Sequence, residues 1–312
     1  MWTISLSVLP IFLLLVCGNL LRRNGFPGGD FWHNADRVVY WVLFPALLFY
    51  NTTTAPFNDA IVGIYAAALI GGLVVTGLVS LALVWLFKIP DPIGGSIFQG
   101  ASRHNTFIAF AVANYMFGDQ GLLLAAVATA VLVPPTNLVC VSVLVGFRGA
   151  SGTMSLKRRL GREIIRNPLL MAIGAGAILN FTGIGPIPVI NDFAGILAKA
   201  ALPVALLSVG AGLRIKSIHT GALYVTISTL CKLLVFPAVI AATVVFFGLH
   251  GMAAMVLIIY GTVPTASSGY ALAKLLGADA EVMAGIITVQ TLLAMITLPL
   301  SLTLAAHYFM TP

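Results

Sequence analysis

The sequence predicts an all-α polytopic membrane protein with ten transmembrane helices, arranged as two inverted five-helix repeats. Of the 312 residues, 60% are hydrophobic and 8% are charged, whereas a soluble domain carries about 25% charged residues. The apolar runs are long enough to cross a bilayer as helices. One long hydrophilic stretch, Arg148 to Arg166, divides the chain into halves that each hold five such runs.

The first apolar run, Ile4 to Leu21, is followed rather than preceded by basic residues, Arg22 and Arg23. This order is typical of an uncleaved first span with an external N-terminus. Turn-forming residues separate most of the later runs, as in Ile89-Pro90-Asp91-Pro92. We expect spans at about residues 4–21, 35–53, 59–87, 94–117, 119–146, 163–183, 190–213, 218–247, 251–276 and 279–306.

The basic residues indicate how the spans are oriented, because positive charge concentrates in cytoplasmic loops. With the N-terminus outside, thirteen of the 16 Lys and Arg residues fall in inner loops or at inner span ends, and none falls in an outer loop. We therefore expect a multi-pass protein of the cell membrane with both termini outside. Residues 148–162 would be a cytoplasmic basic linker between the repeats 1–147 and 163–312. The net charge of +7 then reflects this orientation and needs no nucleic-acid partner.

Five spans per half is an odd number, so halves that share a fold must be inserted in opposite orientations. Pro45 and Pro203 take matching places in spans 2 and 7. Spans 4 and 9 both carry polar, glycine-containing centres, at residues 94–106 and 261–269. Paired interruptions of this kind are typical of inverted-repeat transporters, which bind substrate at discontinuous helices.

The centre of span 9 reads Gly261-Thr262-Val263-Pro264-Thr265-Ala266-Ser267-Ser268-Gly269. Pro264 removes one backbone donor, and the glycines add freedom where a helix needs none. Within a membrane, freed N–H and C=O groups are tolerated where protein or water satisfies them. We expect a break that lines a cavity. A proline-kinked packing helix is the alternative interpretation.

Arg103, in the centre of span 4, is the most informative single residue. An arginine at mid-span costs roughly 2.5–3.5 kcal/mol, and no Asp or Glu lies at mid-depth in any predicted span. A planar guanidinium without an internal partner suits a carboxylate ligand. The alternative is a structural arginine that binds backbone carbonyls of the break.

The neighbours of Arg103 complete a candidate site. In a continuous helix Gln99, Arg103 and Thr106 would share one polar stripe, and the second break would add hydroxyls and exposed amides. His104 is either a proton-exchanging group or a hydrogen-bonding spacer. Tyr270 and Gln290 are further candidates for the cavity wall, and for Lys199 and Lys232 we favour structural pairing. The candidate substrate-binding residues are Gln99, Arg103, His104, Asn105, Thr106, Thr265, Ser267 and Ser268; the candidate structural residues are Gly100, Gly261, Pro264, Gly269, Pro45 and Pro203.

Signatures of enzymes and metal sites are missing from the sequence. It contains no HExxH, GxSxG or phosphate-binding GxxxxGK[ST] motif. Cys17, Cys140 and Cys231 all lie inside apolar runs and form no CxxC or Cys/His cluster. We therefore expect no catalytic activity, no cofactor and no metal.

Several short segments are similar to a known family. They are Leu9 to Phe12, Gly18 to Arg23, Val38 to Phe49 around Pro45, Arg103 to Thr106, and Val263-Pro264. Together they resemble the auxin efflux carrier family in its short bacterial form. The likeness extends over nearly the whole chain, although each motif is short. His104 stands where the plant-type Leu-Pro-Asn-Thr pattern of the first crossover has proline.

The resemblance implies a scaffold of spans 1, 2, 6 and 7 and a moving transport domain of spans 3–5 and 8–10, with crossed broken helices 4 and 9. It implies an elevator mechanism, often in a homodimer, for organic anions such as indole-3-acetate, malonate or malate. By the same likeness, Asn105 would bind the substrate carboxylate, and Pro264 would have a structural role.

Two other functions are compatible with part of the sequence. A cation-coupled symporter or antiporter of similar fold normally needs acidic residues at the crossover, and this chain has none there. A membrane sensor would bind a ligand without moving it, but the sequence holds no soluble output domain.

Overall fold

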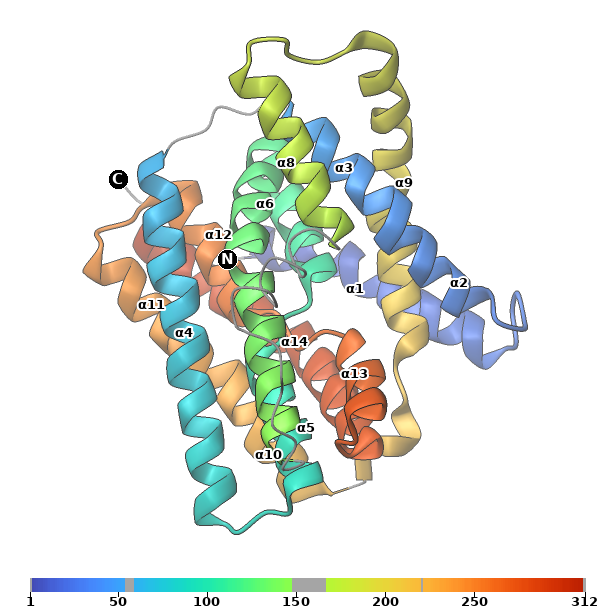
Figure 1. Cartoon of the computed structure of the whole chain (residues 1–312), viewed down its shortest axis with the longest axis vertical. Coiled ribbons are helices and arrows are strands. Elements are labelled where there is room, and N and C mark those ends of the chain that lie inside the picture. Colours follow the sequence, from blue (N-terminus) through green and yellow to red (C-terminus); the bar gives the residue numbers. More distant parts are fainter. Residues whose placement is uncertain (1, 54–58, 148–166, 220, 311–312) are drawn as a thin grey trace.

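The structure, a computed structural model, describes residues 2–53, 59–147, 167–219 and 221–310 (Figure 1). These ranges are helical and contain no strand. Five helices in them are long and apolar enough to cross a membrane: 61–86, 91–147, 188–212, 222–246 and 280–309. The prediction of an all-α polytopic membrane protein is confirmed. The basic linker 148–162 lies outside the described residues.

One group of helices contains residues of the predicted spans 1, 2, 6 and 7. In it α1 runs along α9, and α3 packs against both α8 and α9, on the right and at the top of Figure 1. A π-helical turn, η1, joins α2 to α3. The bounds are α1 Trp2–Arg23, α2 Phe31–Val38, η1 Val39–Leu43, α3 Phe44–Thr52, α8 Pro168–Phe181 and α9 Pro188–Gly212. We call this group the first bundle.

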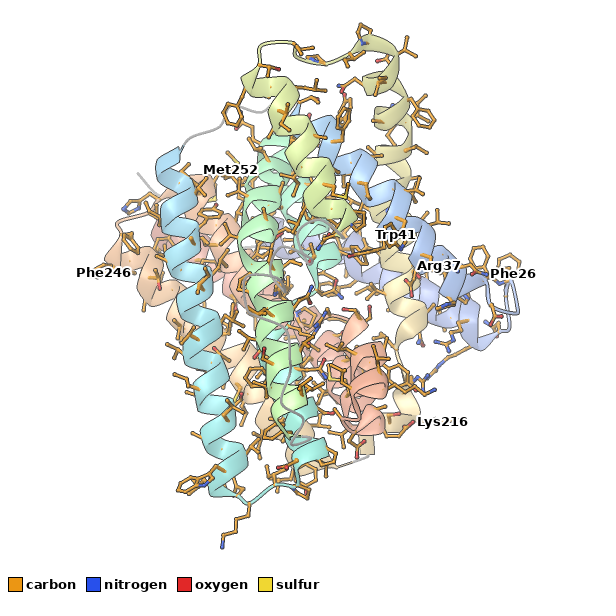
Figure 2. The ribbon with its side chains drawn as sticks, viewed as in Figure 1. Phe26, Arg37, Trp41, Lys216, Phe246 and Met252 are labelled. Carbon is orange, nitrogen blue, oxygen red and sulfur yellow. The ribbon has the colours of Figure 1, made fainter. Side chains whose placement is uncertain are left out.

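The remaining helices form the second bundle, in which α12 packs between α6, α11 and α14, and α4 packs against α5, α6 and α11. The bounds are α4 Asp59–Leu86, α5 Asp91–Ser102, α6 Thr106–Phe147, η2 Ile215–His219, α10 Ala222–Leu230, η3 Cys231–Val235, α11 Phe236–Phe246, α12 Gly251–Thr262, α13 Ser268–Leu276 and α14 Ala280–Phe309. Large apolar side chains such as Phe246, which is 81% exposed, project from its outer surface (Figure 2), as expected of a surface that faces lipid.

Local sequence explains where these helices are interrupted. Gly118 has φ 58° and ψ −144° and divides α6 at the predicted boundary between spans 4 and 5. Pro45 and Pro237 each follow a π-helical turn and a buried phenylalanine. A proline lacks a backbone donor, and a π-helical turn changes the local bonding pattern so that the helix continues. Pro203 lies within α9, which runs through it.

Glycines let α1 and α9 approach each other closely. A Cβ at Gly210 would lie 1.9 Å from the carbonyl oxygen of Leu15, and a Cβ at Gly18 would lie equally near that of Leu207. The side chain of Asn19 donates a hydrogen bond to the Gly210 carbonyl at 3.2 Å. Small residues that bring backbones together are a general means of packing membrane helices, because van der Waals contact drives their association.

We expect Gly210→Ala to destabilise the protein, because its added methyl group would meet backbone atoms that cannot move without shifting a helix. Overpacking of this kind costs about 1–3 kcal/mol. Thermal unfolding of the purified protein in detergent measures the effect. Gly212→Ala, on the same helix, is the matched control, since nothing lies within 4 Å of a Cβ there. Equal melting temperatures for the two variants would show that the α1–α9 contact is looser than described.

Candidate functional site

Both predicted breaks are present, and they touch. The helices α5 and α12, each 12 residues long, end at Ser102 and Thr262, and extended residues follow them. The backbone N–H of Asn105 donates a hydrogen bond of 2.7 Å to the carbonyl of Pro264. The side chain of Asn105 accepts from the N–H of Ile108 at 3.2 Å and so caps the start of α6. One residue therefore satisfies groups on both sides of the contact.

Gln290, on α14, holds the two breaks together from behind. Its Oε1 accepts a hydrogen bond from the N–H of Thr265 at 3.0 Å, and its Nε2 donates to the carbonyl of Gly100 at 3.1 Å. Gln290 is fully buried. We predicted this residue in the cavity wall, and that interpretation is wrong, because both ends of its amide are used by freed backbone groups.

The glycines beside the breaks allow close packing. A Cβ at Gly100 would lie 2.3 Å from Ser228 Oγ and 2.5 Å from Ile286 Cγ2. At Gly269 it would lie 2.4 Å from Met283 Cε, and at Gly261 it would lie 3.3 Å from the side chain of Ile240. Gly100 is thus needed for the approach of α5 to α10 and α14, whereas the flexible end of the Met283 side chain could move away from a Cβ at Gly269.

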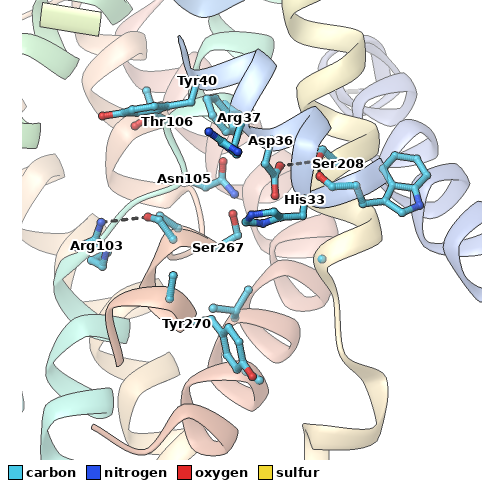
Figure 3. A pocket seen from close by; sticks show the side chains of 18 of the residues that line it. His33, Asp36, Arg37, Tyr40, Arg103, Asn105, Thr106, Ser208, Ser267 and Tyr270 are labelled. Atoms are coloured by element: carbon cyan, nitrogen blue, oxygen red, sulfur yellow. Dashed lines mark hydrogen bonds between the residues drawn. The ribbon is translucent and has the colours of Figure 1, made fainter. Parts of the chain in front are cut away.

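A cavity of about 980 Å³ opens between the two bundles and reaches both breaks (Figure 3). Its floor includes Arg103 and Asn105 from the first break and Ser267 from the second. Its walls come from α2, the residues that precede it and α9 on one side, and from α6, α13 and α14 on the other. The predicted residues that line it are Arg103, His104, Asn105, Thr106, Ser267, Ser268 and Tyr270.

Arg103 is the cation at the base of this cavity. Its Nη2 donates a hydrogen bond to Ser268 Oγ at 3.0 Å (Figure 3). Its Nε and Nη1 atoms are buried and have no hydrogen-bond partner in the part of the chain that the structure describes, and the Cys140 thiol lies beside the guanidinium. Within the described residues, the one ion pair joins Arg214 to Glu281. The expected absence of an acidic partner for Arg103 therefore holds across these residues.

Gln99 and Thr265, which we also predicted in the site, do not reach the cavity. Both are fully buried, and the Thr265 hydroxyl lies 3.5 Å from the Gln99 carbonyl. The polar stripe was inferred for a continuous helix, but α5 ends at Ser102 and Arg103 is extended, with φ −77° and ψ 160°. The break therefore turns Arg103 toward the cavity and leaves Gln99 behind it.

Sequence reasoning missed the part of the site that the first bundle supplies. Arg22 and Arg37 line the cavity, and so does Arg214, which follows the end of α9. The sequence predicted only that these residues mark membrane orientation. The guanidinium of Arg214 lies 4.2 Å from the centroid of the Tyr270 ring. Asp36 also lines the cavity and accepts a hydrogen bond from Ser208 Oγ (Figure 3). The sequence signal that could have identified this part of the site was the clustering of basic residues near the ends of predicted spans 1, 2 and 7.

A second cavity of about 690 Å³ is lined by residues farther along α3 and α6, among them Leu47 and Ala111. Phe44 and Phe110 lie in the sequence between these residues and those that line the first cavity. The ring of Phe44, from the first bundle, lies 4.5 Å from that of Phe107 and 5.6 Å from that of Phe110, centroid to centroid. Lys199 lines this second cavity together with Asp119 and Asp192. The interface between the bundles is thus hollow on both sides of a closed aromatic contact.

Comparison with known proteins gives one family and two relatives. A family model described as membrane transport protein matches residues 150–302. An uncharacterized transporter of Methanothermobacter thermautotrophicus is 25% identical over 303 residues, which cover 94% of this chain and 96% of the relative. An uncharacterized transporter of Methanocaldococcus jannaschii is 23% identical over 304 residues, with the same coverage.

We expect Gln290→Leu to lower the stability of the protein markedly. The change removes the acceptor for Thr265 N–H and the donor to the Gly100 carbonyl, and each buried group left unsatisfied costs about 1–3 kcal/mol. Thr291→Val is the matched control, because the hydroxyl of the buried Thr291 bonds only to Ile287, within its own helix. Thermal unfolding in detergent compares the two. If Gln290→Leu melts at the temperature of Thr291→Val, the amide of Gln290 does not hold the breaks.

Proposed function

Because the chain belongs to the auxin efflux carrier family of membrane transport proteins, we propose that it is a secondary transporter of small organic carboxylates. The observation that carries this proposal is Arg103, a cation at the contact of two broken helices with two buried donor nitrogens unused. A carboxylate presents two acceptor oxygens in the geometry that a guanidinium fork matches. The carboxylate of the ligand would accept the hydrogen bonds of Arg103 Nε and Nη1, for which the described residues provide no acceptor.

The surroundings of Arg103 support an anionic substrate. Arg22, Arg37 and Arg214 also line the cavity, where together with Arg103 they outnumber the two acidic residues, Asp30 and Asp36. An excess of one sign of charge in a cleft raises the local concentration of the opposite ion. Asn105 lies beside Arg103 in the cavity floor and is the second candidate contact of the carboxylate. Ser267 and Ser268, from the other break, add hydroxyl groups.

The arrangement also supports alternating access by an elevator movement. In this proposal the first bundle is the fixed scaffold, the second bundle carries the two breaks, and the halves are inverted five-span repeats. The cavity that reaches the breaks is lined by the basic span ends that we expect on the cytoplasmic side, so this state would be open to the cytoplasm. Phe44 would then close the outer side against Phe107 and Phe110. A homodimer is the expected assembly.

We expect Arg103→Ala to abolish uptake of the labelled substrate, and Arg103→Lys to weaken it. Hydrogen bonds to charged groups are worth about 1.5–3 kcal/mol each, so losing the guanidinium should reduce affinity by roughly tenfold to a hundredfold or more. Lysine keeps the charge but loses the bidentate fork. Uptake of labelled malonate, malate and indole-3-acetate into proteoliposomes, with binding to purified protein, measures both effects.

Arg23→Ala is the matched control for this experiment. Arg23 is an exposed inner-end arginine that does not line the cavity, so uptake should stay at the wild-type level. Melting temperatures of all variants separate loss of binding from loss of folding. An Arg103→Ala protein that binds the substrate as wild type does, or that fails to fold, would assign Arg103 a structural role.

The elevator movement predicts that the aromatic contact must open in every transport cycle. In a background without Cys17, Cys140 and Cys231, the pair Phe44→Cys and Phe107→Cys should be cross-linked by mercury, since the native rings lie 4.5 Å apart. Cross-linking should stop uptake, and excess thiol should restore it. Phe44→Cys alone should be insensitive to mercury. Full transport activity in the cross-linked protein would show that the two bundles need not separate at this point.

A further inference from the structure

Lys232 carries a buried amine that the proposed carboxylate site does not use. Its side chain is fully buried, and its Nζ has no hydrogen-bond partner among the described residues. Nζ lies 4.0 Å from the centroid of the Phe236 ring. The residue lines neither cavity and belongs to the π-helical turn η3. Such turns are rare and occur frequently at functional sites.

Other buried polar groups without partners lie on elements next to Lys232. The turn η3 packs against α4 and α5, and α5 also packs against α4 and α10. The side chains concerned are Thr76 on α4, Gln99 and Ser102 on α5, His104 in the first break, and Thr229 on α10. Buried polar groups are normally satisfied, so a concentration of unsatisfied ones requires a physical explanation. The cluster lies behind the break that holds Arg103.

No carboxylate in the described chain pairs with Lys232. Besides α4 and α5, η3 packs against α10, α11, α12 and α14. Tyr65 on α4 and Tyr260 on α12 donate their hydroxyls to the carbonyls of Ala253 and Ala125. Among the side chains that the structure describes on these helices, the other ionisable ones lie in terminal turns: Asp91, Tyr224, Glu281, His307 and Tyr308. The Cys231 thiol is adjacent in the chain.

We propose that Lys232 takes up one proton with each carboxylate, so that the protein is a proton–carboxylate symporter. The step forms one N–H bond, as the neutral amine of Lys232 accepts a proton and becomes an ammonium. This inference rests on the proposed transport function and adds its coupling ion. Lys232 belongs to the same bundle as the two breaks, so the proton and the substrate would move together.

The geometry explains why this amine can change its protonation state. Burial without a counter-ion favours the neutral amine, whereas the face of the Phe236 ring favours the ammonium. Because these two effects oppose each other, the equilibrium between the neutral amine and the ammonium form of Lys232 depends on nearby charge. At an effective dielectric of about 20, an opposite charge ~10 Å away changes a proton affinity by roughly tenfold. A carboxylate bound at Arg103 would supply that charge.

His104 provides a route for the proton. The residue lines the cavity, yet it is 4% exposed, and both of its ring nitrogens are buried without hydrogen-bond partners in the described chain. Its two nitrogens allow an imidazole to accept a proton on one side and release one on the other. In this proposal His104 passes protons between the cavity and Lys232, and Lys232 holds the proton during transport.

Calorimetry of carboxylate binding tests the inference on the purified protein. Titrations with malonate, malate and indole-3-acetate in two buffers of different ionisation heat count the protons taken up per ligand between pH 6 and 9. We expect the wild type to take up as much as one proton for each carboxylate that it binds. Lys232→Met should still bind the carboxylate but take up no proton.

Lys232→Met replaces the buried amine by an apolar chain of similar length and should fold well. Lys232→Gln is a second variant. Lys274→Met, which changes an exposed lysine of α13, should behave as wild type.

Each outcome bears on a different claim. Carboxylate binding without proton uptake in wild type, or undiminished uptake in Lys232→Met, overturns the symport proposal and leaves the transport function intact. Loss of uptake in His104→Asn with full uptake in Lys232→Met would place the proton on the imidazole and also overturns it. A wild type that binds none of the three carboxylates overturns the proposed function itself.

Transport in proteoliposomes gives an independent measurement. An inward proton gradient should drive wild-type accumulation of the bound carboxylate at least several-fold above its external concentration. Lys232→Met should exchange labelled for unlabelled carboxylate but lose gradient-driven accumulation. Accumulation by Lys232→Met equal to that of wild type would contradict the proposal.

Discussion

The structure depends on one requirement, which is that backbone groups freed inside the membrane must find partners within the protein. Two helices end near each other at Ser102 and Thr262, and each end releases N–H and C=O groups. An unsatisfied group in hydrocarbon costs several kcal/mol. The hydrogen bond from Asn105 N–H to the Pro264 carbonyl and the two bonds of Gln290 satisfy groups of both breaks at once. The breaks are therefore stable only as a pair, which makes their contact a fixed point of the second bundle.

This requirement also shapes the electrostatics of the site. Broken helices leave extended residues whose side chains can point into a cavity, and Arg103 is such a residue. Its surroundings contribute one hydroxyl acceptor and no carboxylate among the described residues. The positive charge is therefore exposed to the cavity and not neutralised within the bundle. Such a site suits the carboxylate substrate that we propose.

The sequence predicted the helical class, the two interruptions and the cation at the first break, because each depends on local composition. Pro264 and the glycines around it are visible without a structure, and so is an arginine inside an apolar run. The positions of Gln99 and Gln290 could not be predicted in this way, since they depend on where α5 ends and on which face of α14 meets the breaks. The place of Arg37 and Arg214 in the cavity wall could not be predicted for a related reason. A basic residue at a span end fits membrane orientation, and only packing shows that it also lines a cavity.

His104 belongs to the first break and lines the cavity that reaches it. The second break contains a proline, whose missing N–H removes one group that would otherwise need a partner. The first break has histidine in the corresponding region, so its shape comes from the cap of Asn105 and from the bond to the Pro264 carbonyl instead. In the proposed coupling, the imidazole at this position carries protons between the cavity and Lys232. The same substitution that departs from the plant-type pattern supplies the titratable group that a buried lysine needs to exchange protons with water.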